Sequence, residues 1–231
     1  MNLNGYDESQ YRIKFSTSDW AVKLSKILGP YAKLSFEPCW DTERHNCMTP
    51  RETAIQSVFS ATSLYYIEFL LEKDPKVVVD IGCGGNIFKK IIPMVHGIDP
   101  TPGNLQADEN DYFDEQFSNN HVNSYESVFS INSIHYVSLK DFKNRFLQFY
   151  NVVKPGGRGF VTFNTSRMLE LTGPHDVKLL FGTESPSTQQ LTEYIENIVQ
   201  NLSIKFLVID ILINNSIDEI MNGNIRLVFE K

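Results

Sequence analysis

Cysteine is scarce in this chain, whose 231 residues include only Cys39, Cys47 and Cys83. No two of them form a CxxC pair, and their odd number leaves at least one thiol unpaired. This usage excludes a disulfide-stapled scaffold and favours reduced thiols. Cys39, His45 and Cys47 lie close together in sequence, but their spacing fits no standard zinc pattern and a fourth ligand is missing. No metal site is therefore expected.

Long apolar runs are also missing. No segment approaches the ~20 apolar residues that a membrane-spanning helix needs, so no membrane span is expected. The N-terminal stretch, MNLNGYDESQYRIKF, lacks the basic start and the apolar run of a signal peptide. Together with reduced thiols, these features predict a cytoplasmic protein.

Positive charge is in the minority, because 21 Lys and Arg face 28 Asp and Glu, a formal net charge of −7. An acidic chain is a poor candidate for a broad phosphate-binding surface, so nucleic acid is not expected as a partner. Apolar residues make up 42% of the sequence, enough for a sizeable core. The length suits one domain with a small extension.

The stretch from Lys76 to Asp99, KVVVDIGCGGNIFKKIIPMVHGID, organises the rest of the chain. Its valine run is typical of a strand buried on both faces of a parallel sheet, and a second apolar strand is expected over 94–98. Between them, Gly82, Gly84 and Gly85 predict a tight turn that a ligand can approach closely. Asp99 follows Asp80 by nineteen positions. This spacing is close to that of an acid that meets a ribose hydroxyl after a glycine-rich turn.

The segment DIGCGGN resembles the first motif of class I S-adenosylmethionine-dependent methyltransferases, in which an acid and an apolar residue precede three alternating glycines. Asn86 stands where the last glycine is usual, and asparagine tolerates a left-handed backbone better than most residues. The resemblance implies S-adenosylmethionine as the cofactor. The binding residues that it implies are Asp80, Ile81, Gly82, Cys83, Gly84, Asp99, Pro100, Asp108 and Asn132. Asp108 is the positional match for an acid that accepts from the adenine amino group.

Downstream segments extend the resemblance to about residues 49–231. Helices are predicted from the capping box at Thr49 to about Lys73, after Ser138, and from Ser187 to Leu202. Strands are predicted at 105–107, 125–131, 160–163, 206–213 and 225–229, with an antiparallel C-terminal pair. VVKPGGRGFV resembles the turn before the fifth strand, and residues 164–186 are read as a polar connection.

The acceptor side is expected after the fourth strand. Asn132 and His135 lie in a segment that resembles the family's fourth motif, and His135 is the candidate general base because its ordinary pKa is near neutrality. A histidine that only anchors the loop is the alternative. Residues 36–47 are expected either to close over this site or to form a surface loop. Motifs of DNA methyltransferases are absent, so a small molecule or a saccharide is the favoured acceptor, without an expectation for the oligomeric state.

The predicted architecture is α/β: a doubly wound, mostly parallel, seven-stranded sheet of Rossmann-like methyltransferase type. Residues 1–48 form a helical extension or lid, including a helix over 18–28, and residues 49–231 form the cofactor-binding domain. Three alternatives stay open. One is an ordinary strand and turn without a ligand. The second is an NAD-dependent oxidoreductase, whose fingerprint needs glycine where Ile87 stands. The third is a non-catalytic protein that keeps the fold.

Overall fold

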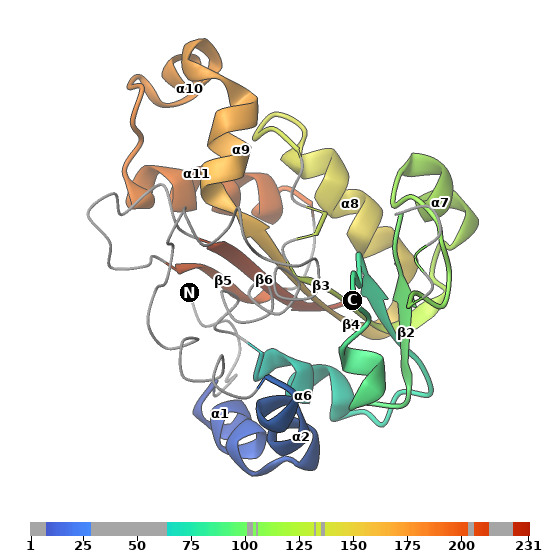
Figure 1. Ribbon diagram of the computed structural model, residues 1–231. Helices are drawn as coiled ribbons and strands as arrows, with labels where there is room; N and C mark the ends of the chain where they lie inside the picture. Colours follow the sequence, from blue (N-terminus) through green and yellow to red (C-terminus); the bar gives the residue numbers. More distant parts are fainter. Residues whose placement is uncertain are drawn as a thin grey trace.

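The structure is a computed structural model that describes residues 8–28, 64–100, 104, 106–131, 133–134, 137–202, 206–212 and 224–231. These residues form one mixed α/β sheet with helices on both faces (Figure 1). Its six strands are β1 (Val78–Ile81), β2 (Val95–Ile98), β3 (Tyr125–Ile131), β4 (Val153–Asn164), β5 (Phe206–Leu212) and β6 (Asn224–Glu230). They lie in the order β2-β1-β3-β4-β6-β5.

The first four strands are parallel, and β6 runs antiparallel to both β4 and β5. The predicted antiparallel C-terminal pair is therefore confirmed. In β1, Val78 packs in the core on one face of the sheet and Val79 in the core on the other, as the period of two in a strand requires. The sequence predicts β1 near the centre of the sheet. In the described sheet β1 is an interior strand, but it lies next to the edge strand β2 and not at the centre.

Helices cover the sheet in two layers. The helical elements are α1 (Glu8–Thr17), α2 (Asp19–Leu28), α6 (Tyr66–Leu71), η1 (Phe88–Lys90), α7 (Glu115–Asn120), α8 (Phe142–Val152), α9 (Thr165–Thr172), α10 (Pro174–Phe181) and α11 (Thr188–Gln200). Residues of α1, α2 and α6 share one core, and those of α8, α9 and α11 share the other. In Figure 1 these groups lie on opposite sides of the sheet. Among the described residues, no helix combines the length and apolarity needed to cross a membrane.

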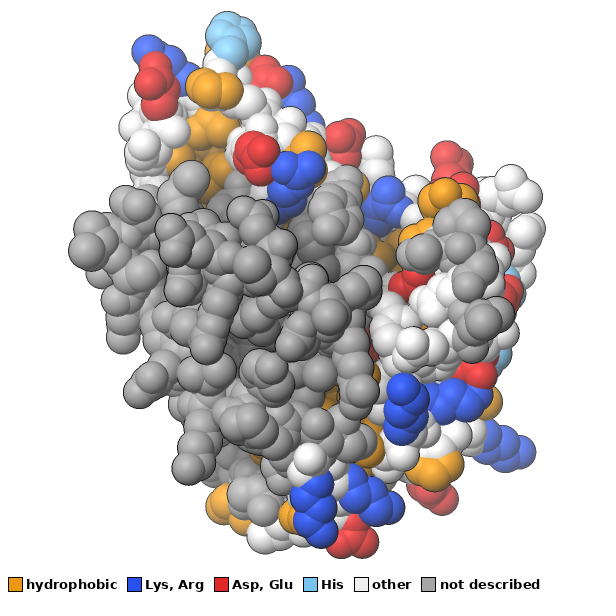
Figure 2. All heavy atoms as spheres, in the orientation of Figure 1, with side chains coloured by type: hydrophobic (Ala, Val, Ile, Leu, Met, Phe, Trp, Pro, Cys, Tyr) orange, Lys and Arg blue, Asp and Glu red, His pale blue; other side chains and the backbone are white. Residues whose placement is uncertain are grey.

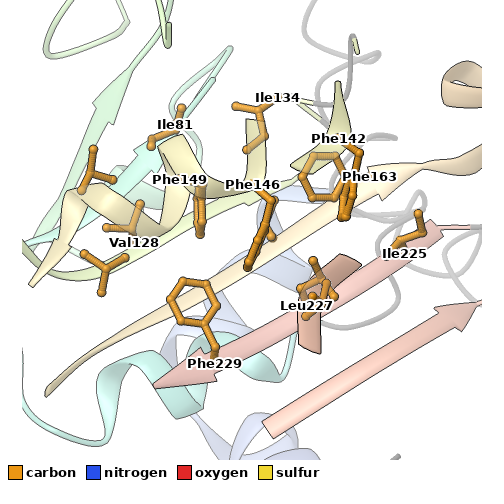
Figure 3. Packing of buried hydrophobic residues seen from close by; sticks show 14 of the residues in the cluster. Ile81, Val128, Ile134, Phe142, Phe146, Phe149, Phe163, Ile225, Leu227 and Phe229 are labelled. Carbon is orange, nitrogen blue, oxygen red and sulfur yellow. The ribbon is translucent and has the colours of Figure 1, made fainter. Parts of the chain in front are cut away.

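The core under α8 is aromatic. Phe142, Phe146 and Phe149 point from α8 onto Phe163 of β4 and Phe229 of β6 (Figure 3). The Phe142–Phe163 and Phe146–Phe229 ring centroids lie 4.9 and 5.6 Å apart in edge-to-face geometry, an arrangement that adds to simple burial. The sequence predicted this helix. Its end, however, lies at Val152, before the glycine pair, and Gly156 and Gly157 belong to β4.

Two segments differ from the prediction. Residues 164–186 are not a simple connection, because α9 and α10 occupy most of them. The Asn164 side chain caps α9 by accepting from the Arg167 N–H, and Pro174 opens α10 directly after Gly173. These local signals outweigh the low apolar content of the segment.

The third strand expected at 105–107 is the other difference. Residues 106 and 107 lie in a turn and a bend, and Leu105 lies outside the described residues. In its place a single parallel bridge joins Ile98 to Glu109. The described sheet thus has six strands instead of seven, because the short segment after Asp99 pairs with β2 at one point only.

A network of charged side chains near the start of β4 attaches helix α1 to the sheet. Arg158 of β4 is 9% exposed and donates to the Phe69 carbonyl at 2.5 Å, to Glu72 at 3.0 Å and to Glu230 at 3.2 Å. Glu72 also accepts from Tyr11 and Lys14 of α1. Although burial favours its neutral acid, these donors lower the pKa of Glu72 to about 2. Glu72 therefore links α1 to the sheet through Arg158.

Candidate functional site

Three parallel strands end together at one edge of the sheet. β1 ends at Ile81, β2 at Ile98 and β3 at Ile131, in continuous register. The buried Ser130 hydroxyl donates to the Ile81 carbonyl at 2.8 Å, which joins the ends of β3 and β1. Open α/β sheets bind ligands outside such carboxyl ends. The predicted site residues after β1 and β2 all lie at this edge.

The turn after β1 has the tight geometry that its glycines predict. Gly82 has φ +77° and Gly84 has φ +50°, values that L side chains rarely adopt. The N–H groups of Gly82 and Cys83 both donate to the Ile98 carbonyl, at 2.7 and 3.0 Å. The turn is therefore folded back against the end of β2.

The space beside Gly82 is filled by Ser133, which follows β3. A β-carbon placed on Gly82 would lie 1.4 Å from Ser133 Oγ and 2.3 Å from its Cβ. The sequence reading attributed the need for glycine here to the approach of a ligand. In the structure, glycine is needed here because the loop after β3 approaches Gly82. This contact places the segment that resembles the family's first motif against the segment that resembles its fourth motif.

Asn86 confirms one prediction directly, because its φ of +46° is left-handed. Its side chain is 2% exposed, and Nδ2 donates to the Gln106 carbonyl at 2.7 Å and to Asp108 Oδ2 at 3.2 Å. The asparagine that replaces the usual glycine therefore also fastens the turn to the segment after β2. It packs so closely on Gly97 that a β-carbon there would lie 2.5 Å from Asn86 Oδ1.

Asp99 and Asp80 are buried carboxylic acids at the ends of neighbouring strands. Asp99, 6% exposed, accepts from the Gly84 N–H through Oδ2 at 2.8 Å. Asp80, 4% exposed, pairs in register with Gly97, so that Asp80 and Asp99 lie toward the same face of the sheet. Burial, and then the charge of Asp99, raise the pKa of Asp80 well above its usual value.

The other implied binding residues occupy distinct positions. The Ile81 side chain is 1% exposed and packs in the core, so only its backbone is at the edge. Cys83 and Pro100 are half-buried, and Cys83 is a free thiol. Burial, and then the charges of Asp80, Asp99 and Asp108, raise the pKa of the Cys83 thiol, which makes a thiolate nucleophile unfavourable at neutral pH.

Both carboxylate oxygens of Asp108 are already held within the chain. Oδ1 pairs with Lys89, and Oδ2 accepts from the Gly97 N–H at 2.8 Å and from Asn86. Although burial favours the neutral acid, these bonds lower the pKa of Asp108 to about 2. Asp108 thus supports the turn, and its contact with an adenine amino group stays a prediction.

The catalytic candidates Asn132 and His135 lie outside the described residues, as do 36–47 and the start of the helix predicted from Thr49. Their roles stay predictions. Within the described ranges, no group of three or more His, Cys, Asp or Glu side chains is arranged to hold a metal ion.

Sequence reasoning missed several residues that build the site. Ser130 and Ser133 link β3 and its loop to β1, and Asn104 Nδ2 donates to the Gly84 carbonyl at 2.8 Å. Serine and asparagine are common in loops, so nothing in the sequence marked these three. Asn86 was noted only for its backbone, although its place in the motif was a usable signal.

These features define the class of the protein: an open α/β sheet with a glycine turn and two buried acids at the carboxyl ends of its parallel strands. Residues 79–161, which span β1 to β4, match the model of a family described as a methyltransferase domain. The resemblance to class I methyltransferases is thereby confirmed over this part of the chain. The comparison with curated proteins found no match to this sequence.

Several solved structures are similar to this chain. A SAM-dependent methyltransferase from Archaeoglobus fulgidus is 13% identical, with 75% of this chain and 93% of that one covered and a TM-score of 0.46. A protein from Pyrococcus horikoshii is 16% identical, with 72% and 87% covered and a TM-score of 0.45. An S-adenosylmethionine-dependent methyltransferase from Mesorhizobium loti is 14% identical, with 67% and 90% covered and a TM-score of 0.44.

Proposed function

We propose that this chain is an S-adenosylmethionine-dependent methyltransferase that binds its cofactor at the carboxyl ends of β1 and β2. The observation that carries the proposal is the placement of two buried acids, Asp80 and Asp99, on either side of the glycine turn within a matched methyltransferase domain. Carboxylates accept hydrogen bonds from ribose hydroxyls and from an ammonium group, which are the polar groups that this cofactor presents.

The residues of the turn have separate roles in this proposal. Asp99 accepts from the ribose hydroxyls, while its bond to the Gly84 N–H fixes the carboxylate in place. Gly82 and Gly84 shape the backbone that lies against the cofactor, with Pro100 and Asn132 beside it. Asp80 faces the positively charged part of the ligand. Asn86 and Asp108 stabilise the turn through the hydrogen bond between their side chains.

The acceptor is proposed to be a small molecule or a saccharide. When bound, S-adenosylmethionine supplies a methyl group that its sulfonium already activates, so the protein contributes mainly by orienting the acceptor, an effect of about 7–11 kcal/mol at most. His135 is proposed to take the acceptor's proton, with Asn132 beside the methyl group. The described part of the face in Figure 2 carries interspersed side chains of both signs, which supports a small acceptor over nucleic acid.

The NAD-dependent alternative is disfavoured by two features. The glycine turn leads into η1, a single 3₁₀ turn at Phe88–Lys90, whereas a dinucleotide pyrophosphate is received at the N-terminus of an α-helix. The buried carboxylate of Asp99 beside the turn would also repel phosphate groups. The second alternative is a protein that binds the cofactor without transferring its methyl group. It shares the proposed cofactor site and differs from the enzyme only in lacking a productive acceptor site.

Calorimetric titration with S-adenosylmethionine, S-adenosylhomocysteine and NADH tests the proposal. We expect saturable binding of the first two and none of NADH. Binding of NADH and not of S-adenosylmethionine would overturn the proposal and revive the oxidoreductase alternative. Transfer of a labelled methyl group to a panel of small hydroxyl, amine and saccharide acceptors then separates an enzyme from a non-catalytic binder. His135→Ala should lower turnover by ~10²–10⁴ if His135 is the base, whereas His135→Gln should keep most activity if it only anchors the loop.

A further inference from the structure

Asp80 is a buried acid to which no described residue offers a compensating partner. Its side chain is 4% exposed, and in the part of the chain that the structure describes its carboxylate takes part in no hydrogen bond or ion pair. A buried carboxylate without a donor or a cation is strongly unfavourable. Such a group is therefore protonated unless a positively charged ligand binds beside it.

The surroundings of Asp80 sharpen this requirement. Asp99 directly follows the neighbouring strand β2 and lies toward the same face, and the Cys83 thiol is near enough to Asp80, Asp99 and Asp108 to feel their charges. The lysines beside the turn are engaged elsewhere, since Lys89 pairs with Asp108 and Lys90 donates to Gln106 at 3.4 Å. On the β3 side, the neighbouring Ser130 hydroxyl is directed to the Ile81 carbonyl. Among the described residues, the charged groups near Asp80 are therefore acids, and the two lysines of the turn bond to other side chains.

We propose that the Asp80–Asp99 pair holds one proton in the ligand-free protein and releases it to solvent when a positively charged ligand binds beside it. The inference rests on the proposed function, because S-adenosylmethionine carries the required positive charge on its sulfonium and its ammonium groups. Asp99 is the member that stays ionised, since the Gly84 N–H donates to it, and Asp80 is the member that keeps the proton. The ligand's charge then replaces the proton.

Proton release makes the affinity depend on pH. Where one proton leaves for each ligand bound, the association constant rises by up to about tenfold per pH unit. The ligand's own amino group has an ordinary pKa of about 8, so it stays charged below pH ~7 and contributes no proton in that range. Titrations between about pH 5 and 7 therefore report on the protein.

The experiment is calorimetric titration of S-adenosylmethionine into the whole chain in two buffers of different ionisation enthalpy at matched pH. The dependence of the observed heat on the buffer gives the number of protons released. We expect close to one for the natural chain and for Asp111→Asn, a matched change of an exposed acid outside the turn. For Asp80→Asn we expect close to none, with an affinity that no longer changes with pH.

The outcomes separate this inference from the proposed function. Binding by the natural chain without proton release across the pH range overturns the inference and leaves the proposed function standing. The absence of binding at every pH overturns both. Because the natural chain alone gives this result, the test does not depend on the folding of Asp80→Asn.

Discussion

The backbone N–H of Gly84 donates to Oδ2 of Asp99 at 2.8 Å, which ties the turn after β1 to the acid that follows β2. The bond orients a buried carboxylate at the edge of the sheet and stabilises its ionised form. On the other side of the turn, Gly82 meets Ser133. The turn is therefore defined by contacts with two neighbouring loops as well as by its own glycines.

The contact between Gly82 and Ser133 predicts a difference between two glycines of similar backbone. Gly82 and Gly182 have φ +77° and +73°, but an added β-carbon meets Ser133 at Gly82 and nothing within 4 Å at Gly182. Gly182→Ala should cost only the left-handed strain of about 1–2 kcal/mol, whereas Gly82→Ala should lose a further ~1–3 kcal/mol from overpacking. Urea unfolding of both variants measures the difference.

Removing the obstructing side chain checks the cause. Ser133→Gly in the Gly82→Ala background should recover most of the extra loss and leave the backbone strain. Equal stabilities of Gly82→Ala and Gly182→Ala would show that the close contact does not constrain the turn.

Asn86 and Gly97 form a second close pair. Gly97→Ala places a methyl group 2.5 Å from Asn86 Oδ1, which forces the buried amide away from Gln106 and Asp108. We expect a loss of about 1–3 kcal/mol in the free energy of unfolding. In the Asn86→Gly background the same change should cost much less, and a double-mutant cycle should give a coupling of about 0.5–3 kcal/mol. Additive effects would contradict the packing described for this pair.

Asp80 predicts a pH dependence of stability. Its pKa is raised in the folded protein by burial and then by Asp99, so the native state binds the proton more tightly than the unfolded state. The stabilisation is therefore fully present below about pH 4 and is lost as pH rises through the folded pKa, by up to about 1.4 kcal/mol per pH unit. Asp80→Asn should remove this loss. Urea unfolding of both proteins from about pH 5 to 8 should show profiles that diverge with rising pH, and parallel profiles would be evidence against a raised pKa.

Much of the sheet was predictable because its strands are local apolar runs. The segments 94–98, 125–131, 206–213 and 225–229 all contain strands close to the expected bounds. The third strand was placed wrongly because its pairing is not local. The Asp108 and Glu109 N–H groups bond to the Gly97 carbonyl, and this polar segment shows no strand pattern by itself. Long-range hydrogen bonds decide its path.

Missed helices have a similar explanation. α1 is held by Tyr11 and Lys14 on Glu72, far away in sequence, and its own apolar pattern is weak. For α9 and α10, the Asn164 cap, the Gly173-Pro174 boundary and the apolar run Leu179-Leu180-Phe181 were readable signals of helix. In the site, the acids and glycines were found because their spacing is characteristic. Ser133 and Asn104 act through contacts that only the folded chain creates.

The most direct test of the cofactor site is the affinity of Asp99→Ala for S-adenosylmethionine, measured by calorimetric titration beside the natural chain and Asp111→Asn. The variant loses charge-assisted hydrogen bonds in a buried site, worth roughly 1.5–3 kcal/mol each, so its affinity should fall by at least about tenfold. Asp111→Asn should bind as the natural chain does. An unchanged affinity in a folded Asp99→Ala variant would contradict the placement of the cofactor at the ends of β1 and β2.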